Sequence, residues 1–483
     1  MIATGFGIAR TVRALRLSIY DGIFANIYIN LTGSVFLPAF ALALGASSLQ
    51  IGILASIPLF ANIAQLGGTY LVEKYNRRKK VAVRSAFAAR ALWLPIVVLS
   101  VLLASRSPWL VLQFAILLIA ISSVLGAVSG VAWLSWMSFI VPGDIRGRYF
   151  GLRNAILGAA NIAFTLLAGR FLDWFRQQQP NGSQLHAFEL LFAFALGCGL
   201  LSVRILARQP EPPSAPQADV NFRAIYRAPL KQKHYRLLLR FAALWSFAVN
   251  MAAPFFIVYM LKVLDLSYTM IALLTVTTAA ADLLGMWLWG QISDRIGNRP
   301  VVWLSAWMIT FLPMLWLFTT KTSSYLLVLL PLLQLSAGFF WAAYNLCSVN
   351  LVLGMASKTS NSAYFAYWAS VNGVAAGLGA LSGGVLAKYL HHLAIDFSFS
   401  AAMEFKTIFL ISGLLRLVSL FMLRRVQEPQ RAAGNLQSGW LNWWPLKKNR
   451  QPRATGGIVL PNRAVDRGIP AYWPLWRLRF NRQ

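Results

Sequence analysis

One acidic residue lies deep inside a long apolar segment and is the clearest candidate for reversible proton chemistry. Asp282 lies about ten residues before the charged end of the apolar segment 268–292, or ~15 Å at the helical rise of 1.5 Å per residue. A charged side chain at the centre of a membrane costs ~2.5–3.5 kcal/mol on insertion scales. Asp282 is therefore predicted to bind and release a proton. The alternative is a protonated carboxyl group that only hydrogen bonds to a neighbouring helix.

A second group of residues combines aromatic rings with side-chain amides inside apolar segments. Two aromatic pairs have members three residues apart, so each pair falls on one helix face. Such a surface suits an uncharged or amphipathic organic solute, unless the rings only fill gaps between helices or meet lipid. Basic residues are scarce in the predicted cavity, which argues against a phosphorylated solute. The predicted cavity residues are Asn26, Asn30, Trp133, Trp136, Asn250, Trp341, Tyr344 and Asn345.

A compact charged turn follows the segment that contains Asp282. Its residues are spaced as Gly290-x-x-x-Asp294-Arg295-x-Gly297-x-Arg299. Gly297 allows the positive φ angle that a tight turn needs. The Asp294 carboxylate can accept hydrogen bonds from a nearby helix N-terminus, where a negative charge is favoured by ~0.3–1 kcal/mol. The alternative is that Arg295 and Arg299 are only basic anchors at one membrane face.

The segments that position these residues have the composition of membrane-spanning helices. The chain of 483 residues is 58% hydrophobic and 12% charged, whereas a soluble domain carries about 25% charged residues. A membrane helix needs about 20 apolar residues, and backbone groups in lipid must be hydrogen bonded within the helix. Twelve membrane helices are predicted, at about 22–45, 49–71, 85–105, 108–141, 154–172, 187–207, 239–262, 268–292, 300–319, 325–356, 364–388 and 405–423.

The basic residues predict the orientation of these helices. Of the 44 Lys and Arg residues, 35 fall on the face that holds both chain ends, 7 fall on the opposite face, and Arg90 and Arg416 lie within segments. Because short basic loops gather in the cytoplasm, both ends are predicted to be cytoplasmic. Arg10, Arg13 and Arg16 precede a first helix that is expected to be retained, with Asp21 near its cytoplasmic edge. No nucleic-acid partner is expected.

The chain divides into two similar halves. A proline-rich stretch separates them, and Glu73 to Arg78 matches Asp294 to Arg299 at an offset of 221 residues. Gly130-x-x-Trp133-x-x-Trp136 likewise recurs as Gly338-x-x-Trp341-x-x-Tyr344, as expected of a duplication. The predicted domains are an N-terminal six-helix bundle, a cytoplasmic linker, a C-terminal six-helix bundle and a basic tail, at 1–207, 208–238, 239–425 and 426–483.

This organisation resembles the major facilitator superfamily, because six plus six helices flank a linker and the charged turn matches the family's loop motif. The resemblance implies an all-α integral membrane fold, in which two six-helix bundles rock around a central cavity. It also implies that the first, fourth, seventh and tenth spans line that cavity.

The charged turns are then expected to form a conformational latch between the halves. Asp294 would pair with Arg146 or Arg148 when the cytoplasmic side is shut, and Glu73 would face the capping residues Thr359, Ser360 and Asn361. The predicted latch residues are Asp294, Arg295, Gly297, Arg299, Glu73, Arg78, Arg146 and Arg148. The motif is degenerate in the first half, where Thr69 replaces the leading glycine.

Two functions remain open at this stage. The first is a secondary active transporter that moves a small organic solute, with protons coupled through Asp282. Proton-coupled drug exporters of the family carry an arginine in span four and a Gly-Pro pair in span five, and the chain lacks both, which disfavours drug–proton antiport. The second is a transporter-like scaffold, assembly factor or lipid-handling protein that does not transport.

The remaining expectations concern partners and location. No enzyme activity, cofactor or metal is expected, because Cys198 and Cys347 lie in different halves and no phosphate-binding glycine-lysine loop is present. The end of the chain from Arg424 to Gln483, with 12 basic residues, two acids and five tryptophans, suits a lipid surface. The protein is expected to be a monomer in a prokaryotic inner membrane.

Overall fold

The computed structural model describes most of the chain up to residue 426. The described ranges are 8–75, 77–142, 145–178, 184–211, 229–321, 328–355, 361–396 and 401–426, without the side chains of some helix-end residues such as Glu73. Asn76, Thr359, Ser360, the middle of the linker and the tail from residue 427 lie outside the described residues. Predictions made for these positions therefore stay predictions.

Twelve stretches of helix in the described residues are long and apolar enough to cross a membrane, as predicted. Three of the first six crossings consist of two consecutive helices, and the remaining three are single. The helices of the N-terminal half are α1 (Ile8–Leu31), α2 (Phe36–Ala43), α3 (Ser48–Ala61), α4 (Ala64–Tyr75), α5 (Arg78–Ala91), α6 (Trp93–Leu103), α7 (Pro108–Ile140), α8 (Arg146–Gln178) and α9 (Leu185–Ala207). Those of the C-terminal half are α11 (Lys233–Lys262), α12 (Tyr268–Ile296), α13 (Asn298–Leu315) with the short η1 (Trp316–Phe318), α14 (Leu330–Met355), α15 (Asn361–Asp396) and α16 (Ala401–Leu423).

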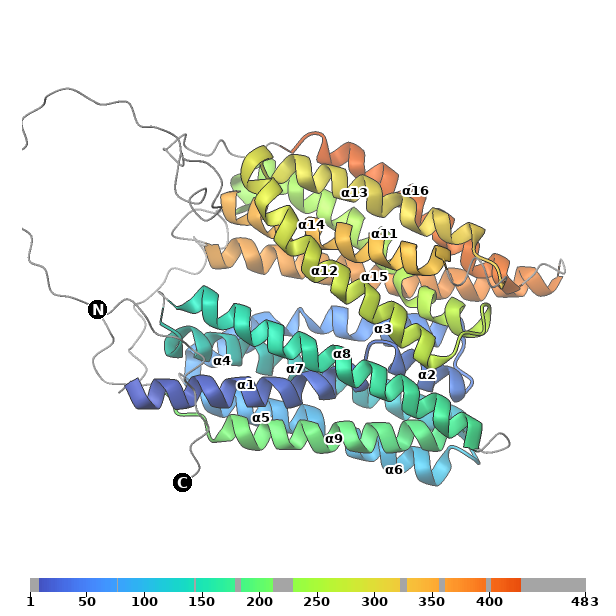
Figure 1. The fold of residues 1–483 in the computed structure, drawn as a ribbon, viewed down its shortest axis with the longest axis horizontal. Helices are drawn as coiled ribbons and strands as arrows, with labels where there is room; N and C mark the ends of the chain where they lie inside the picture. The colour runs from blue at the N-terminus through green and yellow to red at the C-terminus, as the bar shows by residue number, and fades with distance from the viewer. Residues whose placement is uncertain are drawn as a thin grey trace, which may run out of the picture. The chain divides into compact units, whose positions relative to one another are not determined.

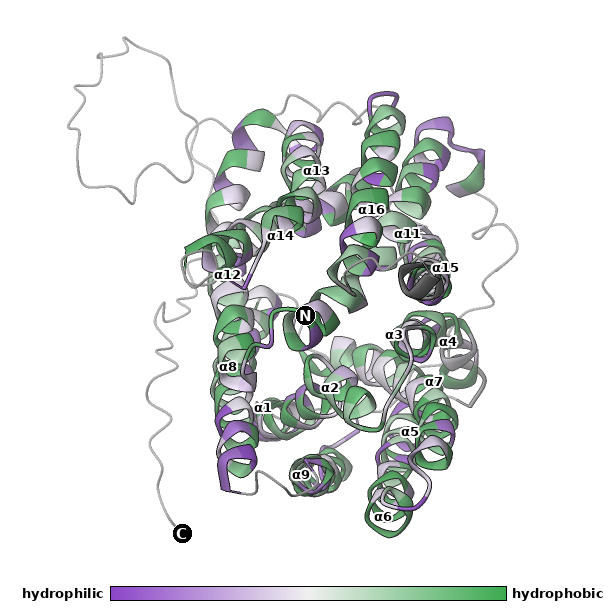
Figure 2. Cartoon of the chain, turned by 90° about the vertical axis from the view of Figure 1, so that its right-hand side faces the viewer, coloured by the Kyte–Doolittle hydropathy of each residue, from purple (hydrophilic) through white to green (hydrophobic). Residues whose placement is uncertain are grey.

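The helices form two six-span bundles, α1–α9 and α11–α16, which run roughly parallel to one another in Figure 1. Successive spans alternate in direction. We call the face where α1 begins and α16 ends the terminal face, and the face where α8 ends and α12 begins the far face. Hydrophobic residues cover most of each helix in Figure 2, and large side chains such as Trp109, Leu284 and Trp287 are more than 60% exposed. Lipid accounts for such a surface, because it is as apolar as these side chains.

The first span begins earlier than its apolar run predicts. Helix α1 starts at Ile8 rather than near residue 22, and its first turns are amphipathic: Arg13 and Arg16 are exposed, whereas Ala14 and Ser18 are fully buried. Asp21 consequently lies in the interior of the bundle with 4% of its surface exposed. Its expected place near the cytoplasmic edge of the span stays a prediction, whereas its burial inside the bundle was not predicted.

Helix ends follow local sequence signals. Ser47 and Gln50 form a capping box at the start of α3, which satisfies free N–H groups of the first turn. Gly297 joins α12 to α13 with φ of +91°, a conformation that costs other residues roughly 1–2 kcal/mol. The predicted role of Gly297 as the turn residue agrees with this geometry.

The two bundles meet in a seam of small residues between α3 and α15. A Cβ atom built on Gly52 would lie 2.7 Å from the carbonyl oxygen of Ala380 and 2.8 Å from the Cα atom of Gly384. Further along the seam, a Cβ atom on Gly373 would lie 2.9 Å from the carbonyl oxygen of Leu59. These glycines therefore allow the two backbones to touch, as small residues do between membrane helices. All these contacts involve α3, the half of the second span nearest the far face.

We predict that a large side chain at Gly52 opens the far face. In a chain with Cys198 and Cys347 replaced by alanine, Ser56→Cys places a buried thiol one turn from Gly52 on the same face of α3. Gly52→Leu should raise the labelling rate of this thiol by a membrane-impermeant maleimide several-fold. Gly67→Leu is the control, because a Cβ atom there meets nothing within 4 Å. Equal labelling in the two variants would show that the seam does not close the far face.

Candidate functional site

A carboxylate of the N-terminal half caps a helix of the C-terminal half at the far face. The Oδ1 and Oδ2 atoms of Asp173, near the end of α8, accept hydrogen bonds from the N–H groups of Tyr268 (3.0 Å) and Thr269 (2.7 Å). The Ser267 hydroxyl accepts from the N–H of Met270 at 3.2 Å. The first three N–H groups of α12 are thus satisfied, two of them by the other bundle. A carboxylate is favoured at this position because the helix dipole is positive at its N-terminus.

Two further contacts join the bundles at the same face. A Cβ atom on Gly169 of α8 would lie 2.9 Å from the carbonyl oxygen of Tyr268, so α8 and α12 are in backbone contact there. The Ser48 hydroxyl at the start of α3 donates to Oε1 of Glu404 in α16 at 2.8 Å. The contacts described here between the halves therefore lie toward the far face. Sequence reasoning missed Asp173, whose only signal was an acid at the end of a predicted span.

At the terminal face, the charged turn of the C-terminal half is held by its own bundle. Nη2 of Arg299 donates to the carbonyl oxygen of Arg424 at 2.9 Å, which caps the end of α16. The buried Asn298 accepts a hydrogen bond from Nδ2 of Asn350 in α14 at 3.2 Å. Asp294 and Arg295 are exposed in the last turn of α12. The turn is thus a rigid part of the C-terminal bundle.

The N-terminal half repeats this arrangement with Arg78, the counterpart of Arg299 at the offset of 221 residues. Nε of the buried Arg78 donates to the hydroxyl of Ser135 in α7 at 3.1 Å, and its guanidinium lies 4.2 Å from the ring centre of Phe139. Nη2 of Arg146 donates to the carbonyl oxygens of Ser138 (3.1 Å) and Val141 (3.4 Å) at the end of α7.

The pairing between the latch residues of the two halves stays a prediction. Arg148 is exposed at the start of α8, and the side chain of Glu73 lies outside the described residues. The structure therefore places Arg78, Arg146 and Arg299 at helix ends of their own halves.

A polar cavity of about 470 Å³ lies within the N-terminal bundle. It is lined by α1, α2, α3, α5, α6, α7, α8 and α9, and its charged lining residues are Asp21, Arg90 and Arg153. This cavity is not the one predicted, so the expected scarcity of basic residues in the predicted cavity stays a prediction. Arg90 was recognised as lying within a span but given no role, and Arg153 directly precedes the predicted fifth span, 154–172. The structure places Arg153 in the second turn of α8, because that helix begins at Arg146 rather than near residue 154.

Hydrogen bonds and ring contacts hold the three charged residues in place. Asp21 accepts a hydrogen bond from the Ser202 hydroxyl of α9 and interacts electrostatically with Arg90 and Arg153. Nη1 of Arg90 donates to the carbonyl oxygen of Gly199 at 2.9 Å, and Nε of Arg153 donates to that of Ser18 at 3.4 Å.

Aromatic rings complete the walls around both arginines. The Arg153 guanidinium lies 4.5 Å from the ring centre of Trp133, and that of Arg90 lies 5.6 Å from the ring centre of Tyr28. Trp93, which meets Tyr28 edge-on, also lines the cavity. The cavity thus combines positive charge with aromatic surface.

Of the cavity residues predicted in this half, only Trp133 lines this cavity. Trp136 is fully buried in the packed core beside Ala132 and Met137. Nδ2 of Asn26 donates to the carbonyl oxygen of Leu157 at 3.0 Å, and Nδ2 of Asn30 donates to the Thr165 hydroxyl at 2.7 Å. The two amides therefore tie α1 to α8.

Two of the four predicted residues of the C-terminal half, Trp341 and Tyr344, lie in an aromatic cluster. Tyr344 stacks on Trp245 of α11 with ring centres 5.1 Å apart, and Trp341 lies 6.3 Å from Trp245. Nδ2 of Asn250 donates to the carbonyl oxygen of Ser246, one turn earlier on α11, at 2.8 Å. Asn345 is exposed. Trp245, which sequence reasoning did not select, brings two of the predicted rings together.

Asp282 lies at the midpoint of α12, fourteen residues from either end. This is ~21 Å from either helix end at 1.5 Å per residue, and its place near the middle of the membrane stays a prediction. The residue is partly buried, and its side chain forms no hydrogen bond or ion pair with other described residues. The structure thus places an acid deep in the span without a protein partner.

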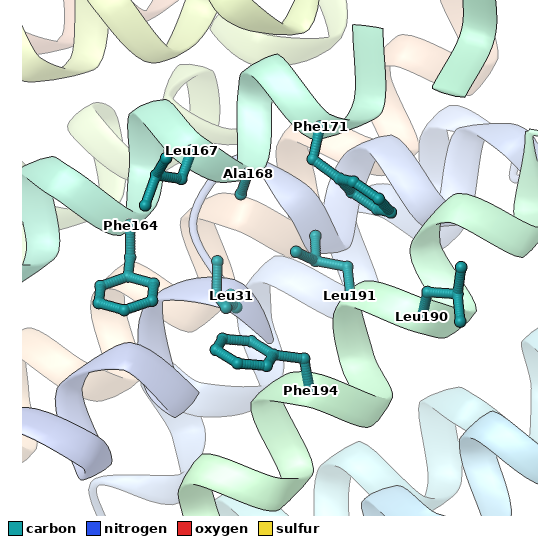
Figure 3. Close-up of a pocket in the computed structure, with 8 residues that line it drawn as sticks. All are labelled: Leu31, Phe164, Leu167, Ala168, Phe171, Leu190, Leu191 and Phe194. Carbon is teal, nitrogen blue, oxygen red and sulfur yellow. The ribbon is translucent and has the colours of Figure 1, made fainter. Parts of the chain in front are cut away.

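A second hollow, of about 390 Å³, is apolar and lies on the outside of the N-terminal bundle between α1, α8 and α9 (Figure 3). Leu167, Leu190 and Phe194, which line it, are more than half exposed. Its side chains carry no group for proton transfer or hydrogen bonding, so it is a lipid-facing groove. The lining residues are Leu31, Phe164, Leu167, Ala168, Phe171, Leu190, Leu191 and Phe194.

Comparison with known families and structures agrees with this architecture. The model of the major facilitator superfamily matches residues 22–249 and 237–480. The chain therefore belongs to the major facilitator superfamily, and it is a multi-pass membrane protein. No curated protein sequence matched the chain.

Solved structures of transporters share the fold at low sequence identity. The nucleoside transporter NupG is 16% identical with a TM-score of 0.64, over 88% of this chain and 100% of that chain. A D-xylose-proton symporter is 17% identical with a TM-score of 0.62, over 87% and 99%. An inward-facing bacterial homologue of the human lysosomal transporter Spinster is 14% identical with a TM-score of 0.62, over 88% and 98%. Membership of the family points to a transporter, and these structures share its fold.

We predict that Asp173→Ala weakens closure of the far face. The change leaves the N–H groups of Tyr268 and Thr269 without their acceptor, which should cost about 1–2 kcal/mol as for other helix caps. Asp173→Asn, which keeps one acceptor oxygen, should have a smaller effect. The measurement is the labelling rate of Ser56→Cys by a membrane-impermeant maleimide, in a chain without its native cysteines, which should rise in Asp173→Ala. A labelling rate unaffected by Asp173→Ala would contradict this role.

Gly297 offers a second test, through its positive φ angle. Gly297→Ala should lower the unfolding temperature of the purified protein, because the strain corresponds to roughly 1–2 kcal/mol. Gly290→Ala is the matched control: it lies two turns earlier within α12, and a Cβ atom there would be 3.8 Å from its nearest neighbour. Equal unfolding temperatures for the two variants would exclude strain at Gly297.

Proposed function

We propose that this chain is a secondary active transporter that moves a small organic solute by alternating access. The observation that carries the proposal is the set of contacts between the bundles, which lie toward the far face between α3 and α15 and between α8 and α12. Two rigid bundles joined in this way can separate at one face and close at the other. Membership of a superfamily with transporter structures among its neighbours supports the proposal.

The terminal face is proposed to be cytoplasmic, on the distribution of basic residues. The structure then corresponds to a state closed to the outside. In the opposite state, Asp294 would pair with Arg146 or Arg148. Asp294 lies at the terminal-face end of α12, and Arg146 and Arg148 lie at the terminal-face end of α8. These two helices touch at the far face. A prokaryotic inner membrane and a monomeric protein remain part of the proposal.

Proton coupling is proposed to run through Asp282. Its depth in α12 and the lack of a side-chain partner among the described residues support this role, because an unpaired charge in the membrane interior is costly. A protonated and an ionised Asp282 would favour different arrangements of the bundles. The carboxyl group would then bind a proton in one arrangement and release it in the other.

The test is uptake and efflux of a panel of organic solutes by vesicles that contain the full chain, with and without a proton gradient. We expect at least one solute to move and its accumulation to require the gradient. Asp282→Asn should abolish accumulation, and deletion of residues 430–483 should not. Asp265→Asn is the matched control, since this exposed residue has φ of +52°, which asparagine also adopts.

Two outcomes would overturn parts of the proposal. Gradient-driven accumulation that survives in Asp282→Asn would exclude this residue from coupling. Absence of movement for every solute, together with normal folding of the protein, would favour a scaffold or lipid-handling protein instead of a transporter.

A further inference from the structure

The polar cavity of the N-terminal bundle carries an excess of positive charge. Its charged lining residues are two arginines and one aspartate, so the excess is one charge when Asp21 is ionised and two when it is protonated. Arg90 and Asp21 are less than 10% exposed. A buried charge without a counter-charge is unfavourable, and the protein provides only one acid here for two guanidinium groups. The cavity is therefore complementary to an anionic group.

Both guanidinium groups have donors to spare. Arg90 forms one hydrogen bond with other described residues, through Nη1 to Gly199, and Arg153 forms one, through Nε to Ser18. A guanidinium has five N–H groups in a planar fork, and this fork matches the two oxygens of a carboxylate. The remaining N–H groups can therefore bind an anion without breaking contacts that hold the arginines in place.

The lack of a side chain at Gly22 makes room for the guanidinium of Arg153. A Cβ atom on Gly22 would lie 2.5 Å from Nη2 and 3.0 Å from Cζ of Arg153. The missing side chain of Gly22 thus lets the guanidinium lie directly against α1, next to Asp21. The guanidinium also lies 4.5 Å from the ring centre of Trp133. Arg153 thus contacts both the backbone of α1 and an aromatic ring.

We propose that this cavity is the binding site for an organic monocarboxylate, whose carboxylate is held by Arg90 and Arg153. One negative charge neutralises the excess when Asp21 is ionised, whereas a phosphate dianion would reverse it. The rings of Tyr28, Trp93 and Trp133 line the cavity beside the arginines and can pack against the apolar part of the solute. The volume of about 470 Å³ lies in the usual range for small-molecule sites. The inference rests on the proposed transport function only in naming the solute class as its substrate.

Direct binding tests the site without any need for transport. Benzoate and hexanoate are titrated into the purified full chain, with benzamide and hexanamide as neutral matches and inorganic phosphate as a competing anion. Binding is measured by microscale thermophoresis. We expect the carboxylates to bind, the amides to bind at least about 10-fold more weakly because they lose a charge-assisted hydrogen bond, and phosphate to compete poorly. Equal affinity for acid and amide, tightest binding of phosphate, or no binding of either carboxylate overturns the proposal.

Variants distinguish the effect of charge in the cavity from a general loss of folding. Arg153→Gln should weaken benzoate binding by about 10- to 100-fold, whereas Asp21→Asn should tighten it, because it removes the competing negative charge. Arg170→Gln is the matched control, as an exposed arginine on the same helix, and should bind like the unaltered chain. If Arg153 and Asp21 only stabilised the fold, both Arg153→Gln and Asp21→Asn would weaken benzoate binding. Unchanged binding in Arg153→Gln overturns the proposal, and Asp21→Asn keeps it testable if Arg153→Gln does not fold.

Uptake into vesicles distinguishes the failure of this inference from the failure of the proposed function. Transport of neutral solutes without carboxylate binding would reject the site and keep the transporter. Carboxylate binding without transport of any solute would keep the site and reject the transporter.

Discussion

Lipid offers no hydrogen bonds and no water to the helices that it surrounds, and the rest of the structure depends on this constraint. Each helix satisfies most of its backbone internally, so the bundles join through close backbone contacts and through side chains. Among these contacts are backbone against backbone at Gly52 and Gly384, and the Asp173 carboxylate at the start of α12. Buried rings add to them at the far face, where Phe188 of α9 lies 5.8 Å from Tyr268 of α12 between ring centres. Two bundles that are joined toward one face in this way can part at the other.

The same constraint applies to the buried arginines, which must find hydrogen-bond acceptors within the protein. Arg90 of the third span donates to Gly199 of the sixth, and Arg416 of the twelfth donates to Ile309 of the ninth at 3.1 Å. In each half, a hydrogen bond from a guanidinium to a backbone carbonyl thus joins the equivalent pair of helices. They differ in surroundings: Arg416 is buried in packed protein, whereas Arg90 lines a cavity beside Asp21 and Arg153. In the first half, the duplicated frame thus carries a cavity with charged walls.

Sequence reasoning predicted what depends on long apolar runs or on a local backbone requirement. The twelve spans follow from hydrophobic length, and the turn at Gly297 follows from the need for positive φ. It failed where a helix extends beyond its apolar run. Asp21 and Arg153 were placed at the membrane edge because they lie outside the hydrophobic windows, yet amphipathic first turns carry both into the bundle. Asp173 was missed because its partners are N–H groups of a helix 95 residues away. The aromatic pairs shared a helix face as predicted, but burial in the core rather than spacing decided the surroundings of Trp136 and Tyr344.

Distances between spin labels, measured by double electron–electron resonance, test the rocking of the bundles most directly. One pair of labels joins α8 to α12 at the terminal face, through Arg148→Cys and Arg295→Cys, and a second pair at the far face joins Ser107→Cys to Asp265→Cys. Both pairs are measured in lipid nanodiscs, with and without a transported solute. The account predicts opposite changes, in which the terminal-face distance shortens as the far-face distance lengthens in the same population of molecules. Distances that stay fixed at both faces, or that change in the same direction, would contradict it.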